Sequence, residues 1–324
     1  MLSSSFGMQI PVLFIVFNRP DTTRKVFEKI RQVKPARLYV AADGPRINVK
    51  DEKEKINMVR DIATNVDWPC EIKTLFRDKN LGCKKGASSA ITWFFEHEEK
   101  GIILEDDCVP HSDFFVFCDN LLNHYFENNK VKVITGSNFQ NNKWRGDASY
   151  YFSKYNHCWG WASWRRSWKN YDGEIKFWPD WKYSDDWKEF ISDDVERKYW
   201  TKIFDLVYAQ KIDSWAYPWL ASTWYNNGIT ATPNVNLISN IGFGEDATHT
   251  KNKSDKNSNK ITSNLKILKH PKNIQTNEDA DTWTFNHHFK GKTFRMPYII
   301  FFIPMRYLKY IFKKLLNFLK ILKY

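Results

Sequence analysis

The chain has 324 residues, a length that allows one large α/β domain or two smaller ones with a substantial core. The net charge is +12, but residues 292–324 hold eight Lys and Arg residues and no acid, so the other residues carry a net charge of only +4. The positive charge is therefore mostly that of the tail, which argues against an enzyme that acts on nucleic acids. The five cysteines form no C-x-x-C pair and the N-terminus shows no signal-peptide pattern. These features argue against disulfides or zinc and lead us to expect a cytoplasmic protein.

Strands and helices alternate through the first 110 residues. Short apolar runs predict strands at 11–17, 37–42, 71–76 and 101–105, and helical periodicity predicts helices at 21–30, 49–66 and 84–97. This alternation predicts right-handed crossovers and a mostly parallel sheet. The sequence therefore indicates an α/β fold whose strand ends meet at one edge.

Polar side chains follow three of these strands. Asn18-Arg19 follows the first, Asp43 the second, and Glu105-Asp106-Asp107 the fourth. Ligands bind at this edge of open α/β sheets. Because consecutive strand residues point to opposite faces, Asp106 and Asp107 are expected to have different roles, although an acidic turn without function is the alternative.

Neither G-x-G-x-x-G nor G-x-x-x-x-G-K-[ST] follows any of these strands. Phosphate groups would therefore need side-chain cations or a metal rather than a glycine-rich loop. Arg19, Arg77 and the lysines at 84 and 85 are candidates for the cations. The carboxylates at 105–107 suit Mg²⁺ or Mn²⁺, which bind oxygen ligands and substrate phosphates.

The second half is rich in tryptophan. After a helix predicted at 112–126 and a strand at 130–135, aromatic residues gather from 144 onward, around a helix predicted at 195–210. We interpret this half as the acceptor side of the site, with core packing as the alternative for each tryptophan. Residues 250–282 have few large apolar residues and predict loop.

The C-terminal residues differ in composition from the rest of the chain. The apolar run 298–303 is too short to span a bilayer, and from 307 onward lysines recur every three or four positions among leucines and phenylalanines. This pattern predicts an amphipathic helix on an anionic membrane surface, with docking on the core as the alternative. The expected domains are 1–290, comprising a nucleotide-sugar half (1–140) and an acceptor half (141–290), and the tail 291–324.

Several short motifs together resemble a known family. In order they are Val12–Pro20, Ala42–Pro45, Arg77–Gly82, Ile103–Asp107, Asp113–Phe115, Trp159–Trp161, Asn240–Gly244 and Thr248-His249. In this order and spacing they resemble GT-A glycosyltransferases of the bacterial family 2-like type and the N-acetylglucosaminyltransferase type that starts complex N-glycan branching. The resemblance ends near residue 275 and implies a three-layer α/β/α fold.

The resemblance also implies roles for individual residues. Asp43 would accept a hydrogen bond from uracil, Arg19 would contact the nucleotide phosphates, and Asp107 would bind the metal. The implied donor-binding residues are Asn18, Arg19, Asp43, Arg77, Glu105 and Asp106, with Asp106 facing the ribose or sugar and Glu105 supporting it. His249 would ligate the metal or touch the diphosphate, unless it is an ordinary surface histidine.

An inverting transfer needs a general base beside the acceptor hydroxyl. Asp213, at the start of Asp-Ser-Trp, is our candidate, and Asp186 in Asp-Asp-Trp is the alternative. The family often has a further acid where this chain has Ala216.

The sequence therefore predicts a Mn²⁺- or Mg²⁺-dependent inverting glycosyltransferase at the inner face of a bacterial membrane. Its donor would be a nucleotide-diphosphate sugar, with UDP favoured. Its acceptor would be a glycan or lipid-linked saccharide of the cell surface. The alternatives are an inactive carbohydrate-binding or assembly protein on the same fold, kept open by Ala216, and a metal-dependent phosphohydrolase.

Overall fold

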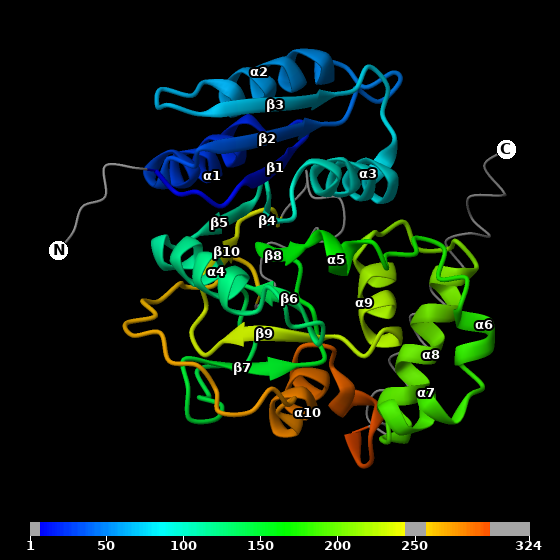
Figure 1. Cartoon of the computed structure of the whole chain (residues 1–324). Coiled ribbons are helices and arrows are strands. Elements are labelled where there is room, and N and C mark those ends of the chain that lie inside the picture. The colour runs from blue at the N-terminus through cyan, green and yellow to red at the C-terminus, as the bar shows by residue number, and fades with distance from the viewer. Residues whose placement is uncertain (1–6, 244–256, 299–324) are drawn as a thin grey trace, which may run out of the picture.

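The computed structural model describes residues 7–243 and 257–298. These residues form an eight-stranded sheet in the order β3-β2-β1-β4-β8-β6-β9-β7, beside a ribbon of β10 and β5 (Figure 1). The strands are β1 (Val12–Val16), β2 (Arg37–Ala42), β3 (Glu71–Phe76), β4 (Lys100–Glu105), β5 (Cys108–Pro110), β6 (Val131–Thr135), β7 (Tyr150–Ser153), β8 (Trp161–Trp164), β9 (Ile229–Pro233) and β10 (Ile238–Asn240).

The helices of the described residues fall between these strands or follow them. They are α1 (Pro20–Val33), α2 (Glu52–Thr64), α3 (Gly82–His97), α4 (Ser112–His124), α5 (Arg165–Trp168), α6 (Trp178–Trp181), α7 (Asp185–Phe190), α8 (Asp194–Tyr208), α9 (Ala216–Tyr225), α10 (Glu278–His287) and the 3₁₀ helix η1 (Gly291–Phe294).

The expected alternation is confirmed in the first half of the sheet. β1 pairs in parallel with β2 and β4, and β2 pairs in parallel with β3. In the second half, β8 runs antiparallel between β4 and β6, β6 pairs in parallel with β9, and β7 closes the sheet antiparallel to β9. The sheet is therefore mixed but mostly parallel.

Two apolar layers cover the sheet. Val12, Phe14 and Val16 point to the face covered by α1, α2 and α4, whereas Leu13 points to the face covered by α3, α5 and α9. This alternation follows from the two-residue repeat of a strand and explains why β1 is apolar throughout. The expected three-layer α/β/α arrangement is thus confirmed.

Most of the tryptophans fill cores. Those that are almost fully buried are Trp161, Trp164, Trp178, Trp187, Trp200, Trp219 and Trp224. Four of them join a third cluster in which α6, α7, α8 and α9 pack together beside the sheet. The expectation that the aromatic half lines an acceptor site therefore does not hold for these residues, which instead supply large buried surfaces to short helices.

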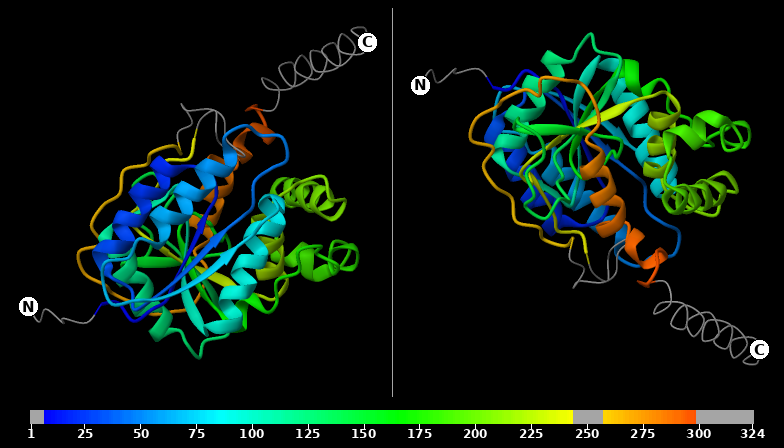
Figure 2. Two further views of the ribbon diagram at one scale, coloured as in Figure 1. Left: turned by 90° about the horizontal axis from the view of Figure 1, so that it is seen from above. Right: turned by 90° about the horizontal axis from the view of Figure 1, so that it is seen from below.

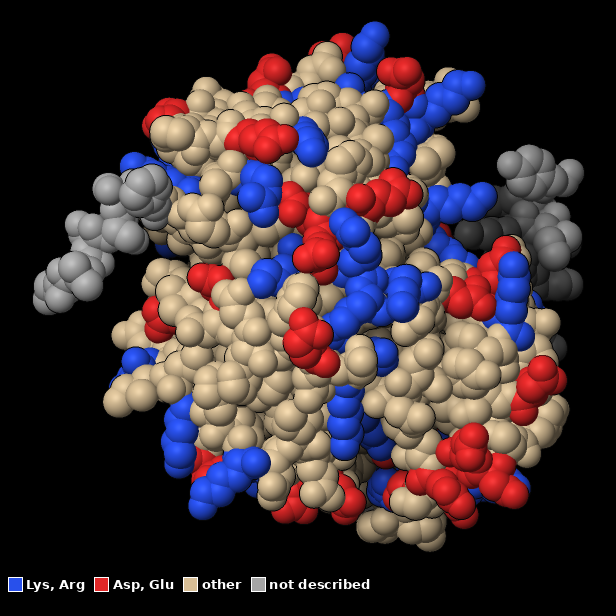
Figure 3. All heavy atoms as spheres, viewed as in Figure 1, with Lys and Arg blue, Asp and Glu red and all other residues tan. Residues whose placement is uncertain are grey.

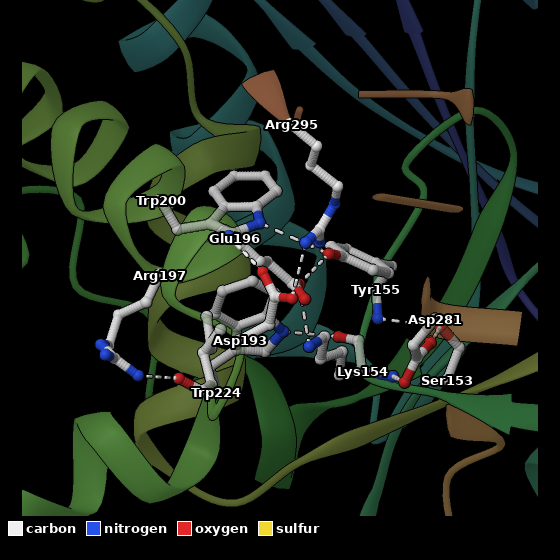
Figure 4. Close-up of polar contacts among 11 residues, drawn as sticks. Ser153, Lys154, Tyr155, Asp193, Glu196, Arg197, Trp200, Trp224, Asp281 and Arg295 are labelled. Carbon is white, nitrogen blue, oxygen red and sulfur yellow. Dashed lines mark hydrogen bonds and ion pairs between the residues drawn. The ribbon is translucent and has the colours of Figure 1, made fainter. Parts of the chain in front are cut away.

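A buried polar network fixes α10 against β7 and α8 (Figure 4). Asp281 of α10 accepts hydrogen bonds from the hydroxyl of Ser153 and, at 3.2 Å, from the amide of Lys154. The Lys154 ammonium forms an ion pair with Glu196 at 2.8 Å, and the Tyr155 hydroxyl donates to the same carboxylate. The network thereby joins the C-terminal elements to the helical cluster.

Basic side chains also gather away from the tail. Figure 3 shows a group of Lys and Arg side chains over α5 on the face seen in Figure 1. Within α5, Arg166 donates to the carbonyls of Tyr125, Phe126 and Val131. These hydrogen bonds link α5 to the C-terminal end of α4 and to the start of β6. This arginine therefore has a structural role in the fold.

No helix of the described residues is long and apolar enough to cross a membrane. The predicted tail helix lies outside the described residues. In the views of Figure 2 the last described segment, 291–298, overlaps the loop that follows β2, whereas in Figure 1 the two lie at opposite ends of the molecule.

Candidate active site

A pocket of about 600 Å³ lies at the carboxyl ends of β1, β2 and β4. The polar side chains that line it include those of Asn18, Arg19, Asp43, Arg46, Arg77, Asn80, Glu105, Asp106 and Asp213. The structure therefore brings together side chains that are up to 195 positions apart in the sequence (Asn18 to Asp213). Asp107 is not among the lining residues.

Arg19 is the centre of the charged part of the site. One of its terminal nitrogens, Nη2, contacts Oδ1 of Asp106 and lies 3.0 Å from Oδ2 of Asp107. Burial opposes the charge on this guanidinium, but the two carboxylates outweigh burial and raise the pKa of Arg19. The guanidinium is thus held as a permanent cation between two acids.

Asp106 and Asp107 share Arg19 as a partner, while the expectation that the two residues have different roles stays a prediction. β4 ends at Glu105, so residues 106 and 107 lie in a turn where the strand alternation no longer applies. Asp106 also accepts a hydrogen bond from the backbone amide of Phe17 at 3.3 Å. Both carboxylates therefore reach the loop between β1 and α1.

Glu105 also lines the pocket. Burial, together with the neighbouring charges of Asp107 and Asp106, raises the pKa of Glu105, and Arg19 opposes this shift. The environment of this carboxyl therefore favours the protonated form more than that of an exposed glutamate does.

Asp43 organises the loop between β3 and α3. Its carboxylate accepts hydrogen bonds from the amides of Gly44, Leu81 and Gly82 at 2.9–3.1 Å. A carboxylate has about four acceptor positions, so these amides use most of them. Asp43 thus holds this loop and also lines the pocket, and its contact with uracil stays a prediction.

Sequence reasoning missed the partner of Asn18. The Nδ2 group of Asn18 donates to Glu52 at 2.8 Å, and the same carboxylate accepts from the amide of Arg46 at 2.6 Å and from its guanidinium. Glu52 is buried, although it lies in the first turn of a helix with a charged sequence. Arg46, which follows Asp43-Gly44-Pro45, is the sequence feature from which this ion pair could have been predicted.

Arg77 lines the pocket and donates to the Ser89 hydroxyl at 2.7 Å. Burial lowers the pKa of Arg77 from the ordinary arginine value, and Asp43 opposes that effect. No carboxylate within the described residues pairs directly with Arg77.

The two candidate bases are placed very differently. Asp213 lines the pocket, and its Oδ1 accepts a hydrogen bond from the backbone amide of Lys84 at 3.2 Å. Asp186 is exposed in the first turn of α7 and does not line the pocket. His249 lies outside the described residues.

The segment that follows β10 covers Asp107. The backbone amide of Ile241 donates to the Asp107 carbonyl at 2.9 Å. A methyl group on Gly242 would lie 2.0 Å from Oδ2 of Asp107, so a larger residue would require the segment or these side chains to shift. Phe243 then packs edge-on against Trp159, with ring centroids 5.7 Å apart.

Few side chains in the pocket region could bind a metal ion. Among the described residues, no three His, Cys, Asp or Glu side chains form a group that could hold a metal ion. Asp107 nevertheless offers a carboxylate, and Mg²⁺ is often bound by one or two carboxylates together with substrate phosphates. The residues therefore fit a divalent cation that a diphosphate completes, provided that Arg19 moves away from Asp107.

No protein-family model and no curated protein matches the sequence. Among solved structures, the chain is similar to a UDP-glucose pyrophosphorylase in complex with UDP-glucose, with 10% identity and a TM-score of 0.26 over 45% of this chain and 62% of that one. It is also similar to a 4-diphosphocytidyl-2C-methyl-D-erythritol synthase from Anaerococcus prevotii, with 8% identity and a TM-score of 0.31 over 57% and 85%. At these low values the similarities say nothing about activity.

Proposed function

We propose that this chain is a glycosyltransferase that takes a sugar from a nucleotide-diphosphate donor, with UDP-sugars as the favoured class. The observation that carries the proposal is a single pocket that combines Arg19, Asp106 and Asp213 at the carboxyl edge of the sheet. Its volume of about 600 Å³ lies in the range of small-molecule sites. The order of the sequence motifs supports the same assignment.

The donor end of the pocket suits a diphosphate. Arg19, Arg46 and Arg77 line it, and planar guanidinium groups bind phosphate oxygens through paired hydrogen bonds. The buried Glu52 holds Arg46 and Asn18 in place. We assign the nucleotide to this end, with Asp43 shaping the loop above it.

The acceptor end needs a base and an apolar surface. An inverting transfer requires a general base opposite the departing diphosphate, and we assign this role to Asp213. Trp159 and Phe243 are partly exposed next to the segment that covers Asp107 and suit the apolar face of a sugar ring. We therefore propose that Asp213 takes the proton of the acceptor hydroxyl and that this aromatic pair contacts an apolar face of the acceptor.

A divalent cation and a membrane complete the proposal. Asp107 would hold Mn²⁺ or Mg²⁺, and the ion would supply positive charge to the leaving diphosphate. The lysine-rich composition of 307–324 supports an acceptor at an anionic membrane, such as a lipid-linked saccharide.

A thermal-shift panel of nucleotide sugars, with and without Mn²⁺, tests the proposal. We expect one UDP-sugar to raise the melting temperature in a Mn²⁺-dependent way, and Asp107→Ala to remove that increase. Asp186→Ala is the matched control, because its carboxylate is exposed and lies outside the pocket lining. Stabilisation without transfer to any acceptor would instead indicate a carbohydrate-binding protein, and no response to any nucleotide would exclude the transferase.

A further inference from the structure

Lys132 is a buried lysine whose ammonium has no partner in the part of the chain that the structure describes. The residue is only 7% exposed, and its ammonium makes no hydrogen bond or ion pair with any described residue. Lysines are almost never buried in proteins unless their charge is paired, because removing an ammonium from water costs free energy. Packing alone therefore does not explain this residue.

A β-bulge sets the direction of this side chain. In the pairing of β6 with β9, residues 131 and 133 face consecutive residues of β9, so Lys132 is an extra residue between them. Val131 and Val133 accordingly pack into clusters on opposite faces of the sheet, although a regular strand would place both on one face. Bulges of this kind change the direction in which a side chain points, and they occur often at functional sites.

The bulge lies on the other edge of the sheet from the pocket. β6 runs in the same direction as β4, because both strands are antiparallel to β8. The pocket lies at the carboxyl end of β4, whereas Lys132 is the second residue of β6 and so lies at the amino end. A ligand of Lys132 would therefore bind apart from the proposed donor site.

The charged groups that act on Lys132 are cations. Burial, and then the charges of Arg166 and Lys169, lower the pKa of Lys132. Arg166 belongs to α5 and Lys169 follows it directly, within the group of Lys and Arg side chains that Figure 3 shows over this helix. Lys169 is exposed, and its ammonium also lacks an ion pair among the described residues. The nearby acid Glu127 acts on Arg166.

Other contacts fix two of these cations in place. The guanidinium of Arg166 donates to three backbone carbonyls and lies over the Trp164 ring, 4.3 Å from its centroid. The hydrocarbon stem of Lys132 passes close to Gly228, where an added Cβ would lie 2.5 Å from its Cδ. The carbonyl of Lys132 accepts a hydrogen bond from the Ser163 hydroxyl at 2.7 Å. Cations that are already held in place lose little side-chain freedom when an anion binds.

We propose that Lys132, Arg166 and Lys169 form a binding site for a phosphate group at the amino edge of the sheet. An ammonium has three donors, and the described residues use none of those of Lys132. A phosphate monoester carries nearly two negative charges at neutral pH and has three acceptor oxygens, which suits three cations better than a single carboxylate does. The phosphate can belong to a soluble compound or to a lipid headgroup. This inference does not depend on the proposed transferase activity.

Inorganic phosphate is the first probe of this site. We expect it to bind the full chain and to raise its melting temperature, measured by calorimetric titration and thermal shift in chloride buffer at constant ionic strength. Lys132→Met should weaken phosphate binding about tenfold or more, because charge-assisted hydrogen bonds are lost. Lys188→Met is the control, since this lysine is exposed on α7 and pairs with Asp185. Phosphate binding that is absent in the wild type or unchanged in Lys132→Met would overturn the proposal.

Stability without phosphate separates a binding role from a structural one. Lys132→Met removes an unpaired buried charge and keeps a side chain of similar length. We therefore expect this variant to melt at a higher temperature than the wild type in phosphate-free buffer, while its response to phosphate is lost. A lower melting temperature would instead show that the fold needs this lysine and would count against the proposal. Lys169→Met changes an exposed side chain, so it should fold normally and bind phosphate several times more weakly.

Vesicles distinguish the two sources of phosphate. Flotation of the full chain with phosphatidic acid vesicles compares the wild type with Lys132→Met and Lys188→Met, all of which keep the lysine-rich tail. If the site binds lipid headgroups, Lys132→Met should need several times more lipid for half-maximal binding, and Lys188→Met should not. Equal lipid affinities, with phosphate binding still lost in Lys132→Met, would assign the site to soluble phosphate compounds. Wild-type binding of both phosphate and vesicles by Lys132→Met would overturn the proposal.

Discussion

The carboxylate of Asp213 accepts a hydrogen bond from the backbone amide of Lys84 at 3.2 Å, although the two residues are 129 positions apart. This contact joins the segment before α9 to the first turn of α3, where a helix attracts negative charge. It holds a carboxylate at the wall of the pocket, and the second oxygen accepts no hydrogen bond among the described residues. The position of the proposed base is therefore set by a helix of the nucleotide half.

Asp213→Asn separates this structural contact from the chemistry. An asparagine oxygen can still accept the Lys84 amide, but the side chain can no longer take a proton. We expect transfer to fall by about 10²–10⁴-fold with nearly unchanged donor affinity, measured by product formation and by thermal shift. Asp186→Asn should behave as wild type, and the reverse result would make Asp186 the base.

Gly242→Ala tests the segment that covers Asp107. The added methyl would lie 2.0 Å from Oδ2 of Asp107 and 2.7 Å from Nη1 of Arg19, so these side chains or the segment must shift. We expect a loss of about 1–3 kcal/mol in the free energy of unfolding and weaker nucleotide-dependent stabilisation. Gly173→Ala is the control, because its nearest neighbour is the Tyr171 hydroxyl at 3.3 Å. Wild-type behaviour of Gly242→Ala would contradict this expectation and show that the side chains of Asp107 and Arg19 admit the methyl group at little cost.

Asp281 gives the stability a pH dependence. Burial, with a smaller contribution from Glu196, raises the pKa of Asp281 from 3.8 to about 7, although Lys154 and two hydrogen bonds oppose the shift. The folded state thus keeps a proton that the unfolded state loses. This contribution is complete below about pH 4 and is lost as the pH rises through 7.

Asp281→Asn should remove this dependence. We expect the wild type to lose roughly 2–4 kcal/mol more than the variant between pH 4 and pH 8, measured by urea unfolding at each pH. Parallel pH profiles for the two proteins would contradict the raised pKa. The Ser153 hydroxyl can still donate to the asparagine oxygen, so the variant should fold.

Lys154 supplies the positive charge of the same network. Its ammonium is 2.8 Å from Glu196, and both side chains are largely buried. Lys154→Met leaves Glu196 without a cation, so we expect a loss of about 3–5 kcal/mol in the free energy of unfolding. Lys176→Met, which breaks an exposed ion pair with Glu174, should cost less than about 1 kcal/mol. Similar losses in both variants would contradict this assignment.

The lysine-rich tail can be tested by deletion. We expect the full chain to float with vesicles that contain anionic lipid, and a chain that ends at residue 298 to remain in the dense fraction. Binding should weaken as salt is raised, because the attraction of lysines to the lipid surface is screened. Flotation of the shortened chain would refute the membrane role of residues 299–324.

The first half of the fold could be predicted from the sequence because its signals are local. β2 and β3 have the predicted bounds, β1 is one residue shorter than predicted at each end, and β4 starts one residue earlier than predicted. Each is a short run of apolar or β-branched residues between turn residues. The antiparallel insertion of β8 could not be predicted, because Trp161–Trp164 is as apolar as a buried helix segment and its pairing depends on distant strands.

The candidate site, like the fold, has features that the sequence predicts and features that it does not. The sequence by itself determined that Arg19, Asp43 and the acids at 105–107 meet at one sheet edge, because parallel strands place their carboxyl ends together. It could not determine that Arg19 holds Asp106 and Asp107 at once, or that Glu52 holds Asn18. Those contacts depend on how turns and helices approach one another after the strands end, which no local periodicity records. Only the tertiary structure could show them, because a side chain's partner depends on packing between segments that are far apart in the chain.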